Sequence, residues 1–365
     1  TGRYCSETGV LLNGVPMSAE LPDVGVWLRE QGGYDSLYLG KWHVPGWRVM
    51  DSFKLTTMGH LIGLQGDLPL AAITRATLNQ RTSKTPFFMT VSLLNPHDIC
   101  SWIKGGSGGL TAEDIGVDPA ELPPLPSNFE ARPQESALFT RVKRDRGFTM
   151  SPEFTRLFRW YYHRYIEVVD GVLGSVLEAL AESRWADNTV VCLTSDHGEG
   201  EGYHGLKFKS SLYEAASTVP MLLHGPGRIP KGQVVEAPID ATSVAPTLCE
   251  LAGVPSLPGC LAPSLLPMLD GGVGRGFAAS QNLVEGRMIR TAAYKYVAYR
   301  GDEAEQFFHL DADPLETLNL LGDSAHASAL QDHRRLLREW EASLVNVPEA
   351  AKSYAEVARK GSDEE

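Results

Sequence analysis

The sequence predicts an α/β protein: a mostly parallel central sheet flanked by helices, followed by a smaller C-terminal α+β part with a short antiparallel sheet. Short apolar runs recur at Ser36 to Leu39, Phe87 to Leu94 and Val190 to Leu193, and another lies in "VPMLLHGPG". They are continuously apolar rather than alternating, as in parallel strands that are buried on both faces. Helical stretches separate the runs, and this alternation favours parallel pairing through right-handed crossovers.

The clearest helix is predicted from Thr155 to Leu180. Apolar side chains recur there at three- and four-residue spacing and form one stripe: Tyr161, Tyr165, Val169, Val172, Val176 and Leu180. Such a stripe is typical of a helix that packs one face against a core.

The segment from Ser101 to Pro152 interrupts this pattern. It is rich in glycine and proline, including "GGSGG" and "ELPPLPSNFEARP". A loop of this length inside a compact domain is usually a functional excursion or a flexible one. We predict a flap near the mouth of the site, with a plain surface loop as the alternative.

The character of the chain changes again near residue 272. "RMIRTAAYKYVAYRGDEAEQFFHL" predicts short antiparallel strands, and an amphipathic helix is expected near Asp332 to Leu344. We therefore predict a main α/β domain over residues 1–272 and a C-terminal subdomain over 273–345. The charged tail, residues 346–365, is expected to fray.

Composition excludes several classes of protein. The 365 residues are 43% hydrophobic and 21% charged, and every apolar run is far shorter than a membrane span. The net charge of −12 argues against nucleic acid or an anionic membrane surface as a partner. An anionic substrate would therefore need a local basic island. The five cysteines are scattered without CxxC spacing, which indicates neither a disulfide framework nor a zinc site.

Polar side chains follow the predicted strands. Lys41 and His43 follow the first strand, His97 follows the second, and Asp196 with His197 follows the third. Ligands of open α/β sheets bind outside the carboxyl ends of the strands, so these clusters are expected at one edge of the sheet. Taken singly, each has a plainer interpretation as a capped loop histidine or a structural aspartate. Beyond a glycine-rich loop lies Lys209, which on residue type alone fits a solvated lysine.

Together these segments resemble the sulfatase family of the alkaline-phosphatase superfamily. "GYDSLYLGKWHVPG" is similar to its GKWH segment, and "NPHD" to its histidine-bearing turn. "TSDHGEGEGYHGLKFKSSLYEAASTVPMLL" is similar to its metal-binding strand end and the HGLxxK lysine. "DATSVAPTLCELAGV", "RMIRTAAYKYV" and "DADPLETLNL" extend the resemblance towards the C-terminus.

The resemblance implies roles for these residues. Asp196 and His197 would form half of a site for a divalent cation, usually calcium. Lys41 and His43 would contact the nucleophile, with His43 as the base that expels sulfate. The sulfate oxygens would be held by His97 and Lys209, one of which protonates the leaving alkoxide. The other histidines are expected to be structural or at the surface, and His204 stays undecided.

The nucleophile implied by the resemblance is a formylglycine, made from cysteine or serine in a CxPSR-type motif that runs into TGRY. The chain begins at "TGRY", and Cys5 follows it with Glu7 where proline belongs and Gly9 where arginine belongs. We therefore expect an N-terminally truncated sulfatase whose nucleophile and paired metal aspartates precede Thr1. This fragment is expected to be inactive and, with two ligands, to bind calcium weakly or not at all.

The resemblance also implies partners and a compartment. A formylglycine-generating enzyme or an anaerobic maturase would modify the full-length protein, and a signal peptide would direct it outside the cytoplasm. The substrate is expected to be a sulfated carbohydrate, ahead of a small aryl or choline ester. Three alternatives stay open: a phosphonate or phosphate ester hydrolase of the same superfamily, a sulfatase relic without activity, and a sugar-binding relative.

Overall fold

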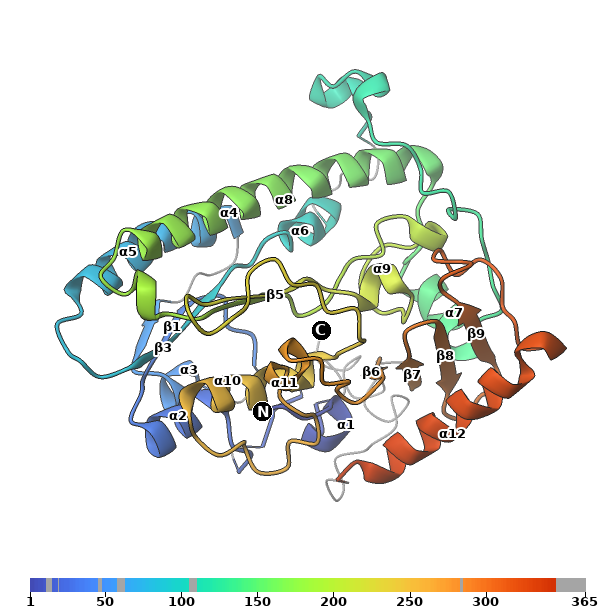
Figure 1. Ribbon diagram of the computed structural model, residues 1–365. Helices are drawn as coiled ribbons and strands as arrows, with labels where there is room; N and C mark the ends of the chain where they lie inside the picture. Colours follow the sequence, from blue (N-terminus) through green and yellow to red (C-terminus); the bar gives the residue numbers. More distant parts are fainter. Residues whose placement is uncertain are drawn as a thin grey trace.

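The computed structural model describes residues 1–10, 15–18, 20–44, 48–57, 63–104, 110–282 and 285–345. Figure 1 shows strands between two layers of helices, with a second sheet and its helix at the C-terminal side. The predicted tail, residues 346–365, lies outside the described residues. No helix among the described residues is long and apolar enough to span a membrane.

The first sheet is parallel, as predicted. Its central strand β1 (Asp35–Gly40) lies between β2 (Leu55–Thr57) and β3 (Phe87–Ser92), and both pairings are parallel. In this register, Gly40 at the end of β1 lies opposite Ser92 at the end of β3. The two strands therefore end together, and the polar segments that follow them leave from the same edge.

The second sheet differs from the prediction of parallel pairing. Here β4 (Val191–Thr194) pairs antiparallel with β5 (Met221–His224). The chain between them forms a single 3-10 turn (Tyr203–Gly205) and the short helix α9 (Glu214–Ser217). It doubles back on the end of β4 through a hydrogen bond from Gly198 N to Ala216 O. The connection therefore re-enters beside β4 in the opposite direction, whereas parallel pairing needs a crossover.

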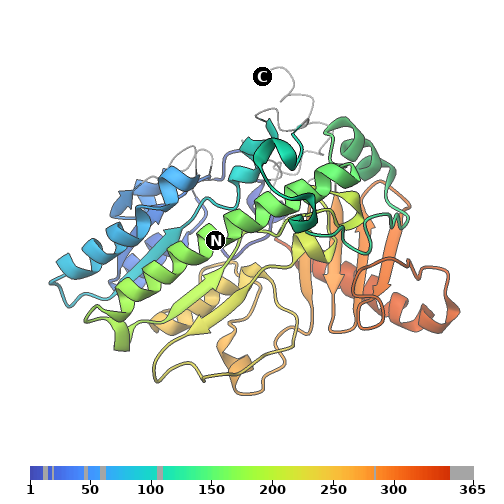
Figure 2. The same cartoon turned by 90° about the horizontal axis from the view of Figure 1, so that it is seen from above.

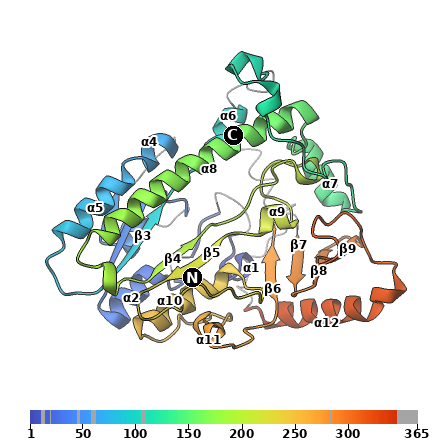
Figure 3. The same cartoon turned by 45° about the horizontal axis from the view of Figure 1, so that its top comes forward.

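The longest helix is α8 (Pro152–Ala181), which confirms the predicted helix and extends it by a few residues. Ser151 caps its start by accepting a hydrogen bond from the backbone N–H of Phe154. It packs along α5 (Leu70–Gln80) and against α6 (Asp98–Lys104). Figure 3 shows α5 and α8 on one side of the strands, with α2 (Val24–Gly32) and α10 (Val244–Ala252) on the other.

The C-terminal sheet is an antiparallel meander, in agreement with the prediction. Its strands run in the order β6 (Ala278–Gln281), β7 (Gly286–Arg290), β8 (Tyr294–Tyr299) and β9 (Glu305–His309). One face packs on α12 (Ala327–Ser343), as Figure 2 shows from above. This helix starts five residues earlier than Asp332, since Leu330 already belongs to the apolar face that the sheet covers.

The excursion from Ser101 to Pro152 is neither a simple flap nor a plain surface loop where it is described. It contains α7 (Ala137–Asp145), whose Phe139 and Val142 are buried with Met288 of the C-terminal sheet. Apolar residues at helical spacing bury themselves here although the flanking segments are rich in proline. Residues 105–109 lie outside the described residues.

The other α-helices of the described residues are short. They are α1 (Cys5–Thr8), α3 (Val49–Ser52), α4 (Gly63–Asp67) and α11 (Leu266–Leu269). Just before α1, Tyr4 packs edge-on against Trp340 of α12 at 5.0 Å between ring centroids. The first turn of the chain thus adds to the core of the C-terminal sheet, and the predicted boundary at residues 272 and 273 stays a prediction.

Candidate active site

A glycine that closes β1 positions Lys41. Gly40 has a φ of +102°, and a Cβ atom there would lie 2.0 Å from the carbonyl oxygen of Ser92. The backbone N–H of Lys41 donates to that same oxygen at 2.8 Å. Only glycine allows β1 to approach β3 this closely, so the glycine of "GKWH" fixes the backbone of Lys41 at the carboxyl end of the strand.

The turn after β3 is held by two buried aspartates. Asp67 accepts hydrogen bonds from the backbone N–H groups of Leu94 and Asn95, at 2.7 and 2.8 Å. Asp98 accepts hydrogen bonds from the amino end of α4. His97 lies between these anchors, at the carboxyl end of β3.

Asp196 and His197 follow β4. The Nζ atom of Lys41 lies 3.7 Å from Oδ2 of Asp196, and Nε2 of His197 lies 3.4 Å from the same oxygen. Nδ1 of His197 lies 2.8 Å from the carbonyl oxygen of Gly198. If this contact is a hydrogen bond donated by Nδ1, the lone pair of Nε2 is available to a ligand on the side of Asp196.

A tight turn fixes the segment that carries Asp196. The backbone N–H of Gly198 donates to Ala216 O at 2.9 Å. A Cβ atom on Gly198 would lie 2.2 Å from the carbonyl oxygen of Ala215. The glycine of "SDHG" therefore permits the close packing of the strand end against α9.

The charges of five side chains act on one another at this edge. Desolvation lowers the pKa of His97, and the ammonium groups of Lys209 and Lys41 lower it further. Desolvation alone would raise the pKa of Asp196, but His197, Lys41 and Lys209 hold it below its ordinary value. Desolvation lowers the pKa of His197 despite the neighbouring carboxylate. The result is one carboxylate, two imidazoles shifted towards the neutral form, and two lysines: the local basic island that an anionic substrate would need.

His43 does not join this cluster within the described part of the chain. It lies two residues beyond Lys41, and its side chain is exposed. The described residues offer it neither a hydrogen bond nor an ion pair. Its assignment as the base stays a prediction that rests on the "GKWH" motif alone.

His204, which the sequence leaves undecided, is buried in a structural role. Its Nε2 lies 3.1 Å from Nδ2 of Asn128, its Nδ1 lies 3.3 Å from the carbonyl oxygen of Ala131, and its ring stacks on Tyr213. Burial lowers the pKa of His204 to about 4. These contacts connect the loop after β4 to the excursion rather than to Asp196.

Glu199 is a residue near the site that sequence reasoning missed. Its carboxylate is buried and accepts a hydrogen bond from the backbone N–H of Phe208, and burial raises its pKa to about 7. Phe208 adopts a φ of +70° directly before Lys209. Glu199 thus ties the loop that carries Lys209 to the end of β4. An acidic residue among the glycines of "SDHGEGEG" was the available signal.

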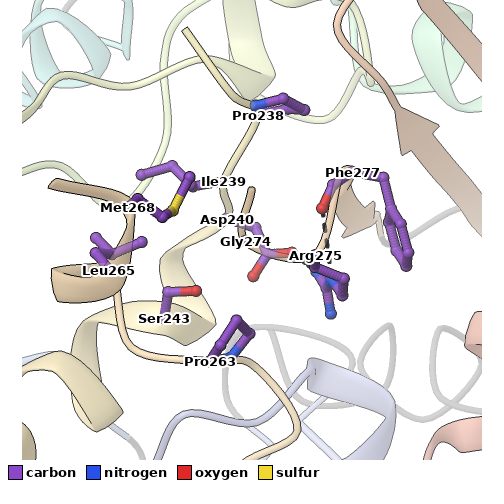
Figure 4. A pocket seen from close by; sticks show the side chains of 10 residues that line it. All are labelled: Pro238, Ile239, Asp240, Ser243, Pro263, Leu265, Met268, Gly274, Arg275 and Phe277. Atoms are coloured by element: carbon purple, nitrogen blue, oxygen red, sulfur yellow. Dashed lines mark hydrogen bonds and ion pairs between the residues drawn. The ribbon is translucent and has the colours of Figure 1, made fainter. Parts of the chain in front are cut away.

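Two cavities lie apart from this edge. Figure 4 shows the smaller one, about 10 Å³, where Asp240 and Arg275 form an ion pair beside Ser243. Asp240 also accepts a hydrogen bond from the hydroxyl of Tyr4, so the cluster fastens the first turn of the chain. The larger cavity, about 430 Å³, is lined by residues that include His204 and Glu214. Neither cavity is lined by Lys41, His97, Asp196, His197 or Lys209.

The whole arrangement can bind an anion and a cation side by side. Lysine ammonium groups and imidazoles aimed at one point stabilise negative charge, and a carboxylate beside an imidazole nitrogen can bind a divalent ion. This combination suits the transfer of an acidic group such as a sulfuryl or phosphoryl group.

Comparison with known proteins agrees with a site for the transfer of a sulfuryl or phosphoryl group. Residues 1–254 match the model of the Sulfatase family, and residues 202–343 match the model described as N-sulphoglucosamine sulphohydrolase, C-terminal. The first match covers more than half of the chain, which therefore belongs to the sulfatase family, as its motifs predict.

The relatives include sulfatases of bacteria and of vertebrates, and two bacterial ones illustrate the similarity. The chain is 29% identical over 279 residues to the Delta 4,5-hexuronate-2-O-sulfatase of Bacteroides thetaiotaomicron, which covers 70% of this chain and 57% of that protein. It is 31% identical over 279 residues to the choline-sulfatase of Rhizobium meliloti, over 72% of this chain and 53% of that protein. The chain thus spans little more than half the length of these relatives.

Solved structures share the fold. A 2-O GAG sulfatase superimposes with a TM-score of 0.80 at 25% identity, over 94% of this chain and 80% of that one. The phosphonate monoester hydrolase of Agrobacterium radiobacter superimposes with a TM-score of 0.73 at 21% identity, over 94% of this chain and 85% of that one. The second likeness establishes the α/β fold and says nothing of the substrate.

Proposed function

We propose that the complete protein hydrolyses a sulfate ester on a carbohydrate. The observation that carries this proposal is the convergence of Lys41, His97 and Lys209 on Asp196 and His197 from four separate segments. A sulfate ester develops negative charge on its leaving oxygen, so cations and hydrogen-bond donors at that point lower the barrier. His97 and Lys209 would hold the sulfate oxygens, and one of them would give its proton to the leaving alkoxide.

Asp196 and His197 fit a role as ligands of a divalent cation. Oδ2 of the carboxylate and Nε2 of the imidazole lie 3.4 Å apart, and Nδ1 lies beside a backbone carbonyl oxygen that could orient the ring. Proteins orient metal-binding histidines by such a second hydrogen bond. We take calcium as the cation by family resemblance, and when bound it would stabilise charge on the sulfate oxygens.

The nucleophile of this proposal is a formylglycine in a segment that precedes Thr1. Within the chain, Cys5 has a poor context, because Glu7 and Gly9 stand at the proline and arginine positions of the motif. A formylglycine-generating enzyme or anaerobic maturase would modify the complete protein. We propose that the mature sulfatase then acts outside the cytoplasm.

The names of relatives support a glycan as substrate. The Bacteroides relative is a hexuronate sulfatase, and one solved neighbour was determined with D-glucosamine-2-N,6-O-disulfate as its substrate. The choline-sulfatase and the phosphonate hydrolase define the competing substrates to test.

The test is hydrolysis by the complete, matured protein of a panel of sulfated sugars, choline sulfate, an aryl sulfate and an aryl phosphonate. We expect sulfated sugars to give the highest kcat/KM. The substitution Lys209→Met should lower it by about 10²- to 10³-fold, the loss typical of one donor to a developing oxyanion. Lys84→Met is the control, since Lys84 is an exposed lysine before β3, at the end of the strand away from the site. Faster turnover of the phosphonate, or hydrolysis confined to the aryl or choline ester, would contradict the proposal.

A further inference from the structure

A second lysine lies on the loop that carries Lys209. The side chain of Lys207 is half-buried, with Nζ 5.2 Å from the ring centroid of Phe208 and 5.8 Å from that of Phe154. Phe154 belongs to the first turn of α8 and stacks on Trp102 of α6. The ammonium group is therefore held over aromatic rings where α6, α8 and the loop meet.

The described residues offer this ammonium group no anionic partner. None of their carboxylates lies within ion-pair distance of Lys207, although the chain carries a net charge of −12. Its backbone N–H is hydrogen-bonded to Phe148 O at 2.8 Å, so the residue is fixed in place. Burial lowers the pKa of Lys207, which shows that its charge is only partly solvated.

A more distant carboxylate does not satisfy it. Glu199 attracts Lys207 without a hydrogen bond or ion pair between them. The carboxylate of Glu199 already accepts the backbone N–H of Phe208. A half-buried lysine without a partner lowers stability, and such groups cluster at sites that bind ligands.

Lys207 lies near the candidate site. Its Cα atom is at most about 7 Å from that of Lys209, and the carboxylate of Glu199, two residues after His197, acts electrostatically on both lysines. A substrate whose sulfate is held by Lys209 could therefore place a second anion against Lys207.

We propose that Lys207 binds a second anionic group of the substrate, a carboxylate or a further sulfate, next to the sulfate that is cleaved. This rests on the proposed function and narrows its substrate class to sugars with two negative charges. The aromatic rings of Phe154 and Phe208 fix the ammonium group and reduce its hydration, which strengthens its attraction for the anion.

The experiment measures binding to the complete protein before maturation, so that no ligand is turned over. Calorimetric titration compares three disaccharides: one with a single sulfate and no other charge, one with the same sulfate and a uronate carboxylate, and one with two sulfates. The wild-type protein, Lys207→Met, Lys207→Arg and the control Lys84→Met are titrated with each.

We expect at least one doubly charged disaccharide to bind the wild type more tightly than the singly charged one, by about ten- to a hundredfold, the range for a hydrogen bond to a charged group. Lys207→Met should remove this difference and leave the singly charged ligand unaffected, while Lys207→Arg and Lys84→Met retain it. The ligand that shows the preference identifies the anion as carboxylate or sulfate.

Two results would overturn the inference: equal binding of all three disaccharides by the wild type, or an equal loss for all three in Lys207→Met, as expected from local misfolding. Failure of the proposed function is a separate outcome. In that case the matured protein would hydrolyse none of the three disaccharides, whatever the effect of Lys207 on binding.

Discussion

At the scale of single residues, His204 shows how burial decides the role of a histidine. The sequence "YHG" places it seven residues after His197, close enough to share the site. Its ring instead stacks on Tyr213, and Asn128 and Ala131 O lie beside its two nitrogens. Because burial lowers its pKa to about 4, the neutral form is the one that the fold accommodates.

This makes stability depend on pH in a defined direction. Between pH 6.5, the ordinary pKa, and about 4, the unfolded chain binds a proton at His204 that the folded chain does not. The free energy of unfolding should therefore rise with pH in this window, by at most about 3 kcal/mol from this group. His204→Asn, which tolerates the positive φ of this position, should reduce the slope by about one proton. Urea unfolding from pH 4 to 7 measures it, and an unchanged slope in the variant would refute the assignment.

At the scale of elements, helix termini and strand ends carry the organisation of the site. The first turn of α8 supplies Phe154, on which Lys207 lies, and the start of the helix is fixed by the side chain of Ser151. The sequence "SPEF" places a serine before a proline and a glutamate, which is a strong signal for a helix start.

Loss of this cap should destabilise the protein modestly. Ser151→Ala removes the hydrogen bond to Phe154 N, and we expect it to lower the free energy of unfolding by about 1 kcal/mol. Ser175→Ala is a matched control on the same helix, where the exposed hydroxyl bonds only to Gly171 O four residues back. We expect Ser175→Ala to change the free energy of unfolding by no more than about 0.5 kcal/mol. Chemical denaturation compares the two, and equal effects would show that the cap contributes nothing specific.

At the scale of the whole molecule, one buried lysine connects the C-terminal sheet to the site. Lys295 of β8 is fully buried, with Nζ 3.0 Å from Glu214 Oε1 and 2.7 Å from Glu316 Oε1. Glu214 begins α9, and α9 is hydrogen-bonded through Ala216 to Gly198, beside His197. The second sheet thus supports the turn that carries the proposed cation ligands.

Removal of this lysine should be strongly destabilising. Lys295→Met leaves the buried carboxylate of Glu316 without its cation, while the partly exposed Glu214 keeps Arg290 at 3.7 Å, and we expect a loss of about 3–5 kcal/mol in the free energy of unfolding. Adding Glu316→Gln should restore part of the loss, because the buried unpaired charge is removed. Arg335→Ala on the exposed face of α12 is the control, and we expect it to change the free energy of unfolding by no more than about 0.5 kcal/mol. Denaturation curves of the three variants measure these changes. A neutral effect of Lys295→Met would mean that the contacts of Lys295 with Glu214 and Glu316 are not needed for stability.

The sequence by itself determined what is encoded by neighbouring residues. Two strands of the first sheet, β1 and β3, together with helix α8 and the C-terminal meander, follow from apolar periodicity, and the motifs around Lys41, His97 and Asp196 are continuous stretches of chain. Family membership follows from the same motifs. Each of these signals extends over a few turns or one strand, so local chemistry is sufficient to predict it.

Only the tertiary structure decided which charges meet and which are buried. The antiparallel pairing of β5, the burial of α7, the contact between Lys41 and Asp196, and the unpaired state of Lys207 each depend on segments far apart in the sequence. The cost of burying a charge depends on what the rest of the fold places around it, and no local pattern records those surroundings.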